Sequence, residues 1–355
     1  MKTGFATFPL DTGKCPKWLF ERMKNLGGLC LEIMLEEFDA EEVLKRLSHP
    51  VWFQSFGCLL AFDWNSSGLT VVLTAALKEA ARERNLDIYF AGGKGKTSLK
   101  TPEELIKIGE KIGLDGEKYS YLSKLVAKID NSLIQDGFNL YHHTFVLTKK
   151  GDWAVIQQGM NVNLEKARRY HWCSLNKNYL DLTIEPHVGI VSDVFFKKVL
   201  NLTAKESYQN KIGIVKILNE ENKFLQEAKK ILTLALYAPK KLFLDNIEFH
   251  YHPVLEEKFD LKRILKTIEK AKFLNPKTIE ELLLIEGVGP KTIRALSLVS
   301  EVIYGSKPSY EDPARYTFAH GGKDGTPYFV DRKTYDETIR VFRKAVELSK
   351  RKLIF

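Results

Sequence analysis

The stretch Ile285–Leu296, IEGVGPKTIRAL, decides the fold of the C-terminal part of this chain. Apolar residues at helical spacing on either side predict one helix over residues 279–285 and another over residues 291–303. Gly287 and Gly289 permit a sharp turn between them, because glycine adopts conformations closed to other residues and leaves the amides uncovered. Amides that open the second helix can donate to a phosphate oxygen, aided by the helix dipole.

This turn is therefore a candidate site for a nucleic-acid backbone. The expected contacts are Gly287, Val288, Gly289, Lys291, Thr292 and Arg294. Residues 278–302 resemble the helix-hairpin-helix motif of DNA repair and recombination proteins, in which the glycine turn holds the backbone without reading its sequence. The resemblance implies a DNA partner, single- or double-stranded, with RNA as a further option, and steep salt dependence. A tight helical corner without a ligand is the alternative.

Charge favours the same partner. The net charge is +9, and residues 261–355 contain 19 Lys and Arg against 12 Asp and Glu. A basic C-terminal quarter indicates a polyanionic ligand, nucleic acid first. A solvated Lys/Arg face without a ligand would give the same count.

Length and composition predict a globular protein of two or three domains. We expect an α+β fold: a mixed α/β putative catalytic domain over residues 1–203, a helical connector over 204–253, and a basic all-α domain over 254–355. The sequence has no run of about 18 apolar residues, so no membrane span is predicted. The four cysteines lack CxxC spacing, and no secretory signal is apparent, which favours reduced thiols in a cytoplasmic protein. Oligomeric state is left open.

Local patterns predict elements in the N-terminal part. Helices are expected over residues 16–37 and 40–47, and a buried strand over 86–93. Thr101, with Glu104 three residues later, predicts a capping box at a helix start. Strands over 141–148 and 153–159 predict a β-hairpin, in which a Lys150-Gly151 turn would place His142 and Gln157 on one polar face. A three-residue loop would change that pairing.

Polar clusters in the first 203 residues predict a site for phosphodiester cleavage. The candidate catalytic residues are Asp63, His142, His143, Gln157, Arg169, His171, Glu185 and His187. Imidazoles move protons, carboxylates bind a divalent metal, and guanidinium groups stabilise a charged phosphate. Asp63 and Glu185 are the expected ligands of Mg²⁺ or Mn²⁺, and Lys94, Lys96 and Arg168 the expected phosphate contacts. For each residue a satisfied polar group, or for Asp63 a helix cap, is the alternative.

A nucleotide cofactor is not expected. The segment G95KT97 fits the end of a Walker A loop, but Phe90 occupies the position of its first glycine. The loop is therefore a candidate for contact with a nucleic-acid backbone, or has no role.

Several blocks together resemble one prokaryotic family, catalogued as domain of unknown function 763. They are F53QSFGCLLAFDWNSSG68, A91GGKGK96, D136GFNLYHHTF145, V155IQQGMN161, A167RRYHW172 and F318AHGGKDGTPY328. The family name implies little chemistry. The residues favour a DNA-binding, metal-dependent nuclease. The alternatives are a DNA glycosylase-like repair enzyme, with Asp312 stabilising a cationic sugar, and a non-enzymatic DNA-binding or architectural module.

Overall fold

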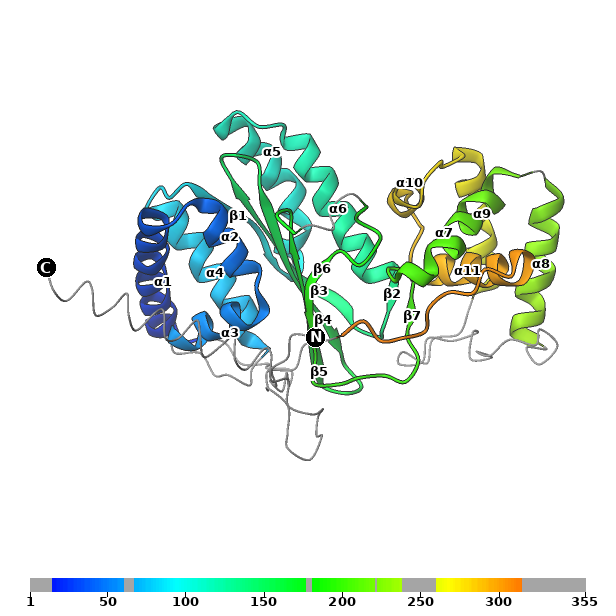
Figure 1. Ribbon diagram of the computed structural model, residues 1–355, viewed down its shortest axis with the longest axis horizontal. Coiled ribbons are helices and arrows are strands. Elements are labelled where there is room, and N and C mark those ends of the chain that lie inside the picture. Colours follow the sequence, from blue (N-terminus) through cyan, green and yellow to red (C-terminus); the bar gives the residue numbers. More distant parts are fainter. Residues whose placement is uncertain (1–14, 61–66, 177–180, 221, 238–259, 315–355) are drawn as a thin grey trace, which may run out of the picture.

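An antiparallel sheet lies at the centre of the molecule, in a computed structural model that describes residues 15–60, 67–176, 181–220, 222–237 and 260–314 (Figure 1). Its strands follow the spatial order β1-β3-β4-β5-β6. They are β1 (Ile88–Lys94), β3 (Asn139–Thr148), β4 (Trp153–Asn161), β5 (Lys166–Cys173) and β6 (His187–Val191). The central strands are buried on both faces, so the sheet is the middle layer of the fold.

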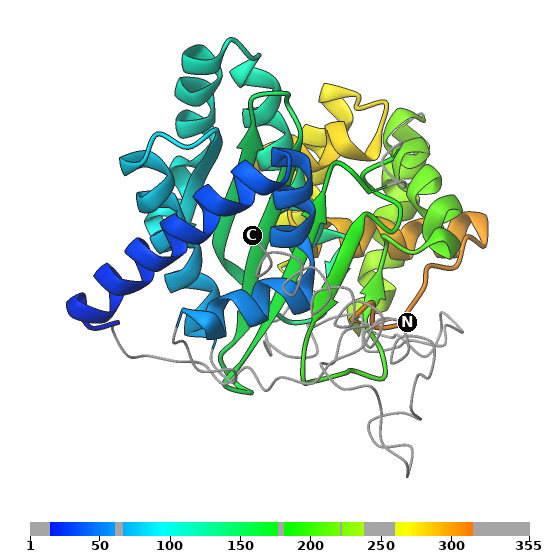
Figure 2. The same cartoon turned by 60° about the vertical axis from the view of Figure 1, so that its left-hand side comes forward.

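Four helices cover one face of this sheet, and the two views of the ribbon agree on this arrangement (Figures 1 and 2). They are α1 (Lys17–Glu37), α2 (Ala40–Ser48), α3 (Pro50–Leu59) and α4 (Gly68–Glu83). Alternate strand residues such as Val146, Ala154 and Ile156 join the hydrophobic cluster of these helices. Burying each such aliphatic side chain contributes about 1.5–3 kcal/mol, which is why the alternation fixes the face.

The opposite face carries the 3-10 helix η1 (Gly95–Lys100) and helices α5 (Thr101–Ile112) and α6 (Gly116–Ser132). Phe145, Val155 and Trp172 point toward them and pack with Leu125 and Ile129 of α6. Because the side chains of a strand alternate between faces, these residues interleave with those that pack against α1–α4.

A helical unit follows the sheet. It comprises η2 (Lys205–Ser207), α7 (Tyr208–Asn219), α8 (Asn222–Tyr237), α9 (Leu261–Leu274), α10 (Ile279–Leu284) and α11 (Pro290–Tyr304). A short ladder of β2 (Ile134–Gln135) and β7 (Leu200–Asn201) lies where it meets α6. One hydrophobic cluster contains both α6 and α7–α11, so the core continues across the expected boundary at residue 203.

The predicted mixed helix-and-sheet fold class is confirmed, as are the helices near residues 17–48 and the pair on either side of residue 287. Within the described ranges no helix is long and apolar enough to cross a membrane. The four cysteines are free thiols.

Two local predictions are corrected. The β-hairpin has a three-residue loop, with Thr148 and Asp152 paired across it, so His143 lies opposite Gln157 and His142 opposite Gln158. Gly151 in this loop has a φ of +92°, which glycine adopts without strain.

The expected capping box at Thr101 does not form. The Thr101 hydroxyl donates to the Ser98 carbonyl, and the Glu104 carboxylate accepts from the Gly92 amide and from Lys78. The preceding 3-10 helix continues directly into α5, so Thr101 is the first residue of α5 and not its N-cap. Glu104 instead fixes the end of β1.

Candidate functional site

Two rows of residues cross the sheet in register and form the most polar part of the core. In an antiparallel sheet, directly opposed residues share a face. His143, Gln157 and Tyr170 point toward α6, with Gly93 at the end of their row, and His142, Gln158 and Arg169 point toward α4, with the exposed Lys94 at the end of theirs. Most of these side chains are buried, so each polar group must find a partner inside the protein.

Asp130 of α6 is the centre of the polar group on the α6 face. Its fully buried carboxylate accepts from Gln157 Nε2 at 2.5 Å, from Trp172 Nε1 at 2.9 Å and from His187 Nε2 at 2.6 Å. The imidazole of His187 also contacts the Trp172 ring, with centroids 4.6 Å apart. A carboxylate and an imidazole are thereby held together on two elements far apart in sequence.

His143 extends this group through Gln157. Because the Gln157 amide nitrogen donates to Asp130, its oxygen faces His143 Nδ1 at 2.7 Å, and Nδ1 must carry the proton. His143 Nε2 then accepts from the Ser123 hydroxyl at 2.8 Å. Burial lowers the pKa of His143, so the ring stays neutral. The chain Ser123–His143–Gln157–Asp130 can orient an imidazole and pass polarisation along it.

Arg169 is the centre of the polar group on the other face. Its guanidinium donates to Gln54 at 2.9 Å, to Thr70 at 3.2 Å and to His171 Nε2 at 2.8 Å. It also lies 4.8 Å from the centre of the Phe53 ring. Burial lowers the pKa of Arg169 to about 9, and burial beside Arg169 lowers that of His171 well below its ordinary value.

His142 belongs to this second group. Its Nε2 lies 3.1 Å from the Thr74 hydroxyl and 3.0 Å from that of Thr144. Burial, with smaller contributions from His143 and Lys94, lowers the pKa of His142 to about 3. The expected pairing of His142 with Gln157 is wrong, because the longer hairpin loop turns them to opposite faces of the sheet.

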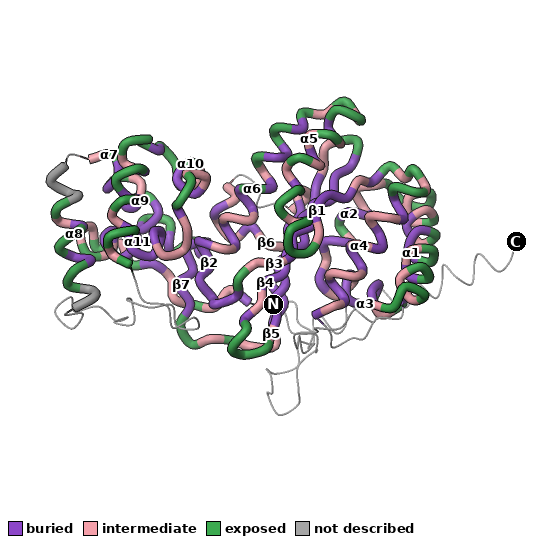
Figure 3. Tube along the Cα trace, turned by 180° about the vertical axis from the view of Figure 1, so that it is seen from behind, coloured by how far each residue is buried: buried purple, intermediate pink, exposed green. Residues whose placement is uncertain are grey.

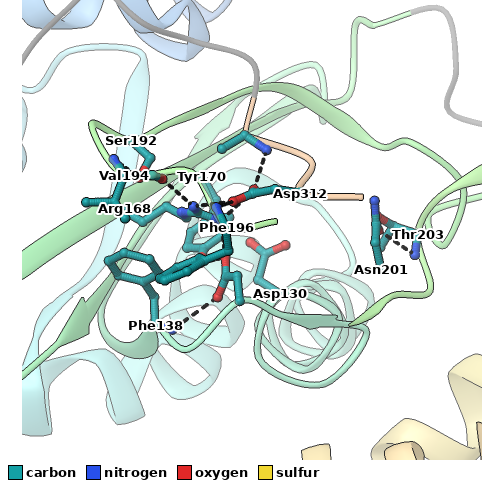
Figure 4. Close-up of polar contacts among 12 residues, drawn as sticks. Asp130, Phe138, Arg168, Tyr170, Ser192, Val194, Phe196, Asn201, Thr203 and Asp312 are labelled. Carbon is teal, nitrogen blue, oxygen red and sulfur yellow. Dashed lines mark hydrogen bonds and ion pairs between the residues drawn. The ribbon is translucent and has the colours of Figure 1, made fainter. Parts of the chain in front are cut away.

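Arg168 is not available to phosphate, contrary to the prediction. Its side chain is fully buried and donates to Asp136 at 2.8 Å and to both carboxylate oxygens of Asp312 at 2.9 Å (Figure 4). Tyr170 donates to the same Asp136 oxygen at 2.7 Å. The Asp312 carboxylate also accepts from the Phe196 amide. These contacts tie the segment after α11 to β5.

The Asp312 carboxylate is thus engaged by a buried guanidinium. A glycosylase-like role for it requires a carboxylate that faces a sugar, and its side chain is only 6% exposed. Burial raises the pKa of the neighbouring Asp136, and the negative charge of Asp312 adds to that effect. The cluster is a structural clasp.

Glu185, Lys94 and Lys96 lie outside both polar groups. Glu185 has a φ of +42°, and its carboxylate pairs with Lys205 at 3.2 Å. Lys94 and Lys96 are exposed, and Lys94 lies 5.8 Å from the Tyr141 ring centre. Asp63 lies outside the described residues, as does the sequence block over residues 318–328. In the described ranges no three His, Cys, Asp or Glu side chains gather as a metal site.

The turn between α10 and α11, residues 285–289, is held against α6. Lys128 donates to the Val288 carbonyl at 2.7 Å, and Gln135 donates to the Pro290 carbonyl at 2.8 Å. Gly287 is exposed with a φ of +93°, and Gly289 caps α11 in an extended conformation. The turn is therefore fixed in place with its glycine backbone outward.

Two expected contacts of this turn are corrected. Arg294 is buried and its Nε donates to Gln135 at 2.8 Å, and Thr292 is buried in the helix packing. Both belong to the buried residues of α11 and therefore lie on its inner side. Val288 is also buried, so its side chain anchors the turn in the core and only its backbone belongs to the turn. Gly287, Gly289 and the partly exposed Lys291 remain candidates.

A family model described as "Protein of unknown function (DUF763)" matches residues 4–330. The chain belongs to this family. No curated protein and no solved structure matches it. Membership in the DUF763 family covers both the sheet and the helical unit, so the two occur together as one family unit.

Sequence reasoning missed several residues of these groups, Asp130 and Ser123 above all. Asp130 follows Ile129 and lies four positions after Val126, so it occupies the apolar face of α6. A carboxylate at such a position predicts a buried partner, and that signal was present. Nothing local identifies the partner, because Gln157, Trp172 and His187 come from three later strands.

Proposed function

We propose that this protein binds the phosphate backbone of DNA at the turn between α10 and α11. The observation that carries this proposal is the exposed, left-handed Gly287 beside Gly289, which caps a 15-residue helix without a side chain. The first amides of a helix have no partner within it, and the helix dipole favours an anion there. A backbone without side chains lets a phosphate approach closely.

Contacts around the turn support this proposal. The first intrahelical bond of α11 runs from the Ile293 amide to the Gly289 carbonyl, so the amides of Lys291 and Thr292 precede it. The Val288 and Pro290 carbonyls accept from Lys128 and Gln135, so two oxygens that would repel a phosphate are already engaged by groups of the protein. The likeness of residues 278–302 to the helix-hairpin-helix motif agrees with this arrangement.

Charge supports it less directly. Between residues 261 and 314 there are nine Lys and Arg against seven Asp and Glu, so most of the basic excess belongs to residues 315–355. Near the turn, Glu286 is exposed and pairs with Lys270 at 3.0 Å. The turn supplies positioned amides, and the long-range attraction comes from elsewhere in the chain.

The test is a titration of labelled duplex DNA with the full chain at several salt concentrations, followed by fluorescence anisotropy. Binding through phosphates predicts an affinity that falls linearly with the logarithm of salt, with little difference between unrelated sequences. Gly287→Ala with Gly289→Ala is expected to weaken binding at least about tenfold. An affinity that does not depend on salt, or a double variant that binds as wild type, refutes the proposal.

A second candidate function is cleavage of the bound strand, favoured by the Asp130–His187 pair. A carboxylate that accepts from an imidazole fixes its orientation, as a general acid or base requires. The His187 side chain is 7% exposed, whereas Asp130, Gln157 and Trp172 are fully buried. Divalent-metal dependence remains a prediction tied to Asp63, since Glu185 meets Lys205 and not another acidic ligand.

The cleavage test uses labelled single- and double-stranded DNA with Mg²⁺ or Mn²⁺, with and without a chelator. Strand cleavage that the chelator abolishes and that His187→Ala strongly reduces supports a metal-dependent nuclease. Release of free base supports a glycosylase. Salt-sensitive binding without either product supports a DNA-binding module and refutes the nuclease hypothesis.

A further inference from the structure

Helix α1 packs firmly against α4 through its inner side. Met23 and Leu31 are fully buried there, and Gly27 and Gly28 allow close approach of α4. A Cβ added at Gly28 would lie 2.6 Å from the Arg84 side chain. The inner face is thus fixed, which determines the side of α1 that faces outward.

The outer side of α1 is apolar as well. Trp18 is 62% exposed, Leu26 44%, Leu29 46% and Ile33 58%. The last three are spaced by three and four residues, the spacing of a coiled-coil seam. We call Trp18, Leu26, Leu29 and Ile33 the α1 stripe; the helix lies at the outer edge of the molecule (Figure 3). A helix apolar on two opposite sides is expected to be covered on both.

Charge at the two ends of the stripe indicates what covers it. Arg22 lies in the N-terminal half of α1 and contacts the Trp18 ring, while Glu36 is exposed near the C-terminal end. A second α1 laid antiparallel across the stripe would set Leu26 against Leu29 and bring Arg22 close to the acidic end of its partner. A parallel pair would set like charges together.

We propose that two copies of this chain associate through their α1 stripes, antiparallel and related by a two-fold axis. Such an interface is self-complementary, because one surface serves both partners. Helix α1 has 21 residues and is about 30 Å long, so the interface is of modest size. The dimer is therefore reversible, with a dissociation constant on the order of micromolar.

Sedimentation equilibrium of the full chain, without DNA, tests this association over concentrations that span the expected dissociation constant. The wild type is expected to be a dimer at the upper end. Leu29→Glu places a charge at the centre of the stripe and weakens the dimer at least about 30-fold. Val162→Glu, a similarly exposed apolar residue between β4 and β5, leaves it unchanged. Circular dichroism confirms that both variants fold.

Charge exchange tests the orientation. Arg22→Glu and Glu36→Arg each weaken the antiparallel dimer, and the two changes in one chain restore it. A full chain that is monomeric at every concentration overturns the proposal, as does a dimer that Leu29→Glu leaves intact. A double variant no tighter than the single ones overturns the antiparallel arrangement.

Discussion

Replacing Arg168 with Met tests whether this residue is a structural clasp. The change leaves the carboxylates of Asp136 and Asp312 buried without the guanidinium that bonds them at 2.8 and 2.9 Å. Removing one partner of a buried ion pair costs about 3–5 kcal/mol, because the charge left behind has neither water nor a counter-ion. We expect a loss of this size in the free energy of unfolding at neutral pH.

Acid should reduce that loss. The pKa of Asp136 is raised above its ordinary value of 3.8 by burial, and Arg168 opposes the rise. Without Arg168 the pKa rises further, so the folded variant binds a proton that the unfolded chain does not. Its stability therefore falls as pH rises from 3.8 through the raised pKa. The deficit against wild type should shrink as pH is lowered through that window.

Urea unfolding followed by circular dichroism measures both effects. Lys149→Met is the control, because Lys149 and Asp87 form a pair more than half exposed, and its midpoint should stay that of wild type. Arg168→Lys, while folded, should bind DNA as wild type does, since the residue is buried. The clasp is refuted if the free energy of unfolding of Arg168→Met lies within about 1 kcal/mol of that of wild type. It is also refuted if the loss of stability does not change with pH.

Three further outcomes are expected. Burial lowers the pKa of Lys211 from 10.5 to about 8, so stability rises with pH across that window, and Lys211→Met should remove the rise in urea unfolding. Asp130→Asn deprives three donors of their buried carboxylate and should cost about 3 kcal/mol; an unchanged midpoint contradicts this. His142 has a pKa of about 3 when folded, so the free energy of unfolding falls as pH drops below 6.5. His142→Gln should make this dependence on pH weaker, and an unchanged dependence contradicts the prediction.

The elements that sequence predicted well are those with local periodicity. Helix α1 and the hairpin of β3 and β4 each carry their pattern within a few turns of chain. The register of that hairpin was missed by one residue, because it depends on whether Gly151 closes a two- or a three-residue loop. This shift of one residue was enough to place His142 and Gln157 on opposite faces of the sheet.

Strand β5 shows why the candidate site was harder to predict. Its arginines and histidine, in KARRYHWC, have the composition of an exposed phosphate-binding segment. They are buried, and the partners that satisfy them come from distant parts of the chain: Asp312 lies 144 residues after Arg168, and Gln54 lies 115 residues before Arg169. Whether a polar residue can be buried depends on its hydrogen-bond partners, and a short stretch of sequence does not contain them.

The most direct test of the proposed function compares Gly289→Ala with Gly305→Ala at the two ends of α11. A Cβ at either position meets nothing within 4 Å, and only Gly305, with a φ of +66°, adds backbone strain. DNA affinity by fluorescence anisotropy should fall at least about tenfold for Gly289→Ala, because the methyl group occupies the phosphate approach, and stay that of wild type for Gly305→Ala. Equal affinities of Gly289→Ala and wild type would contradict phosphate binding at this turn.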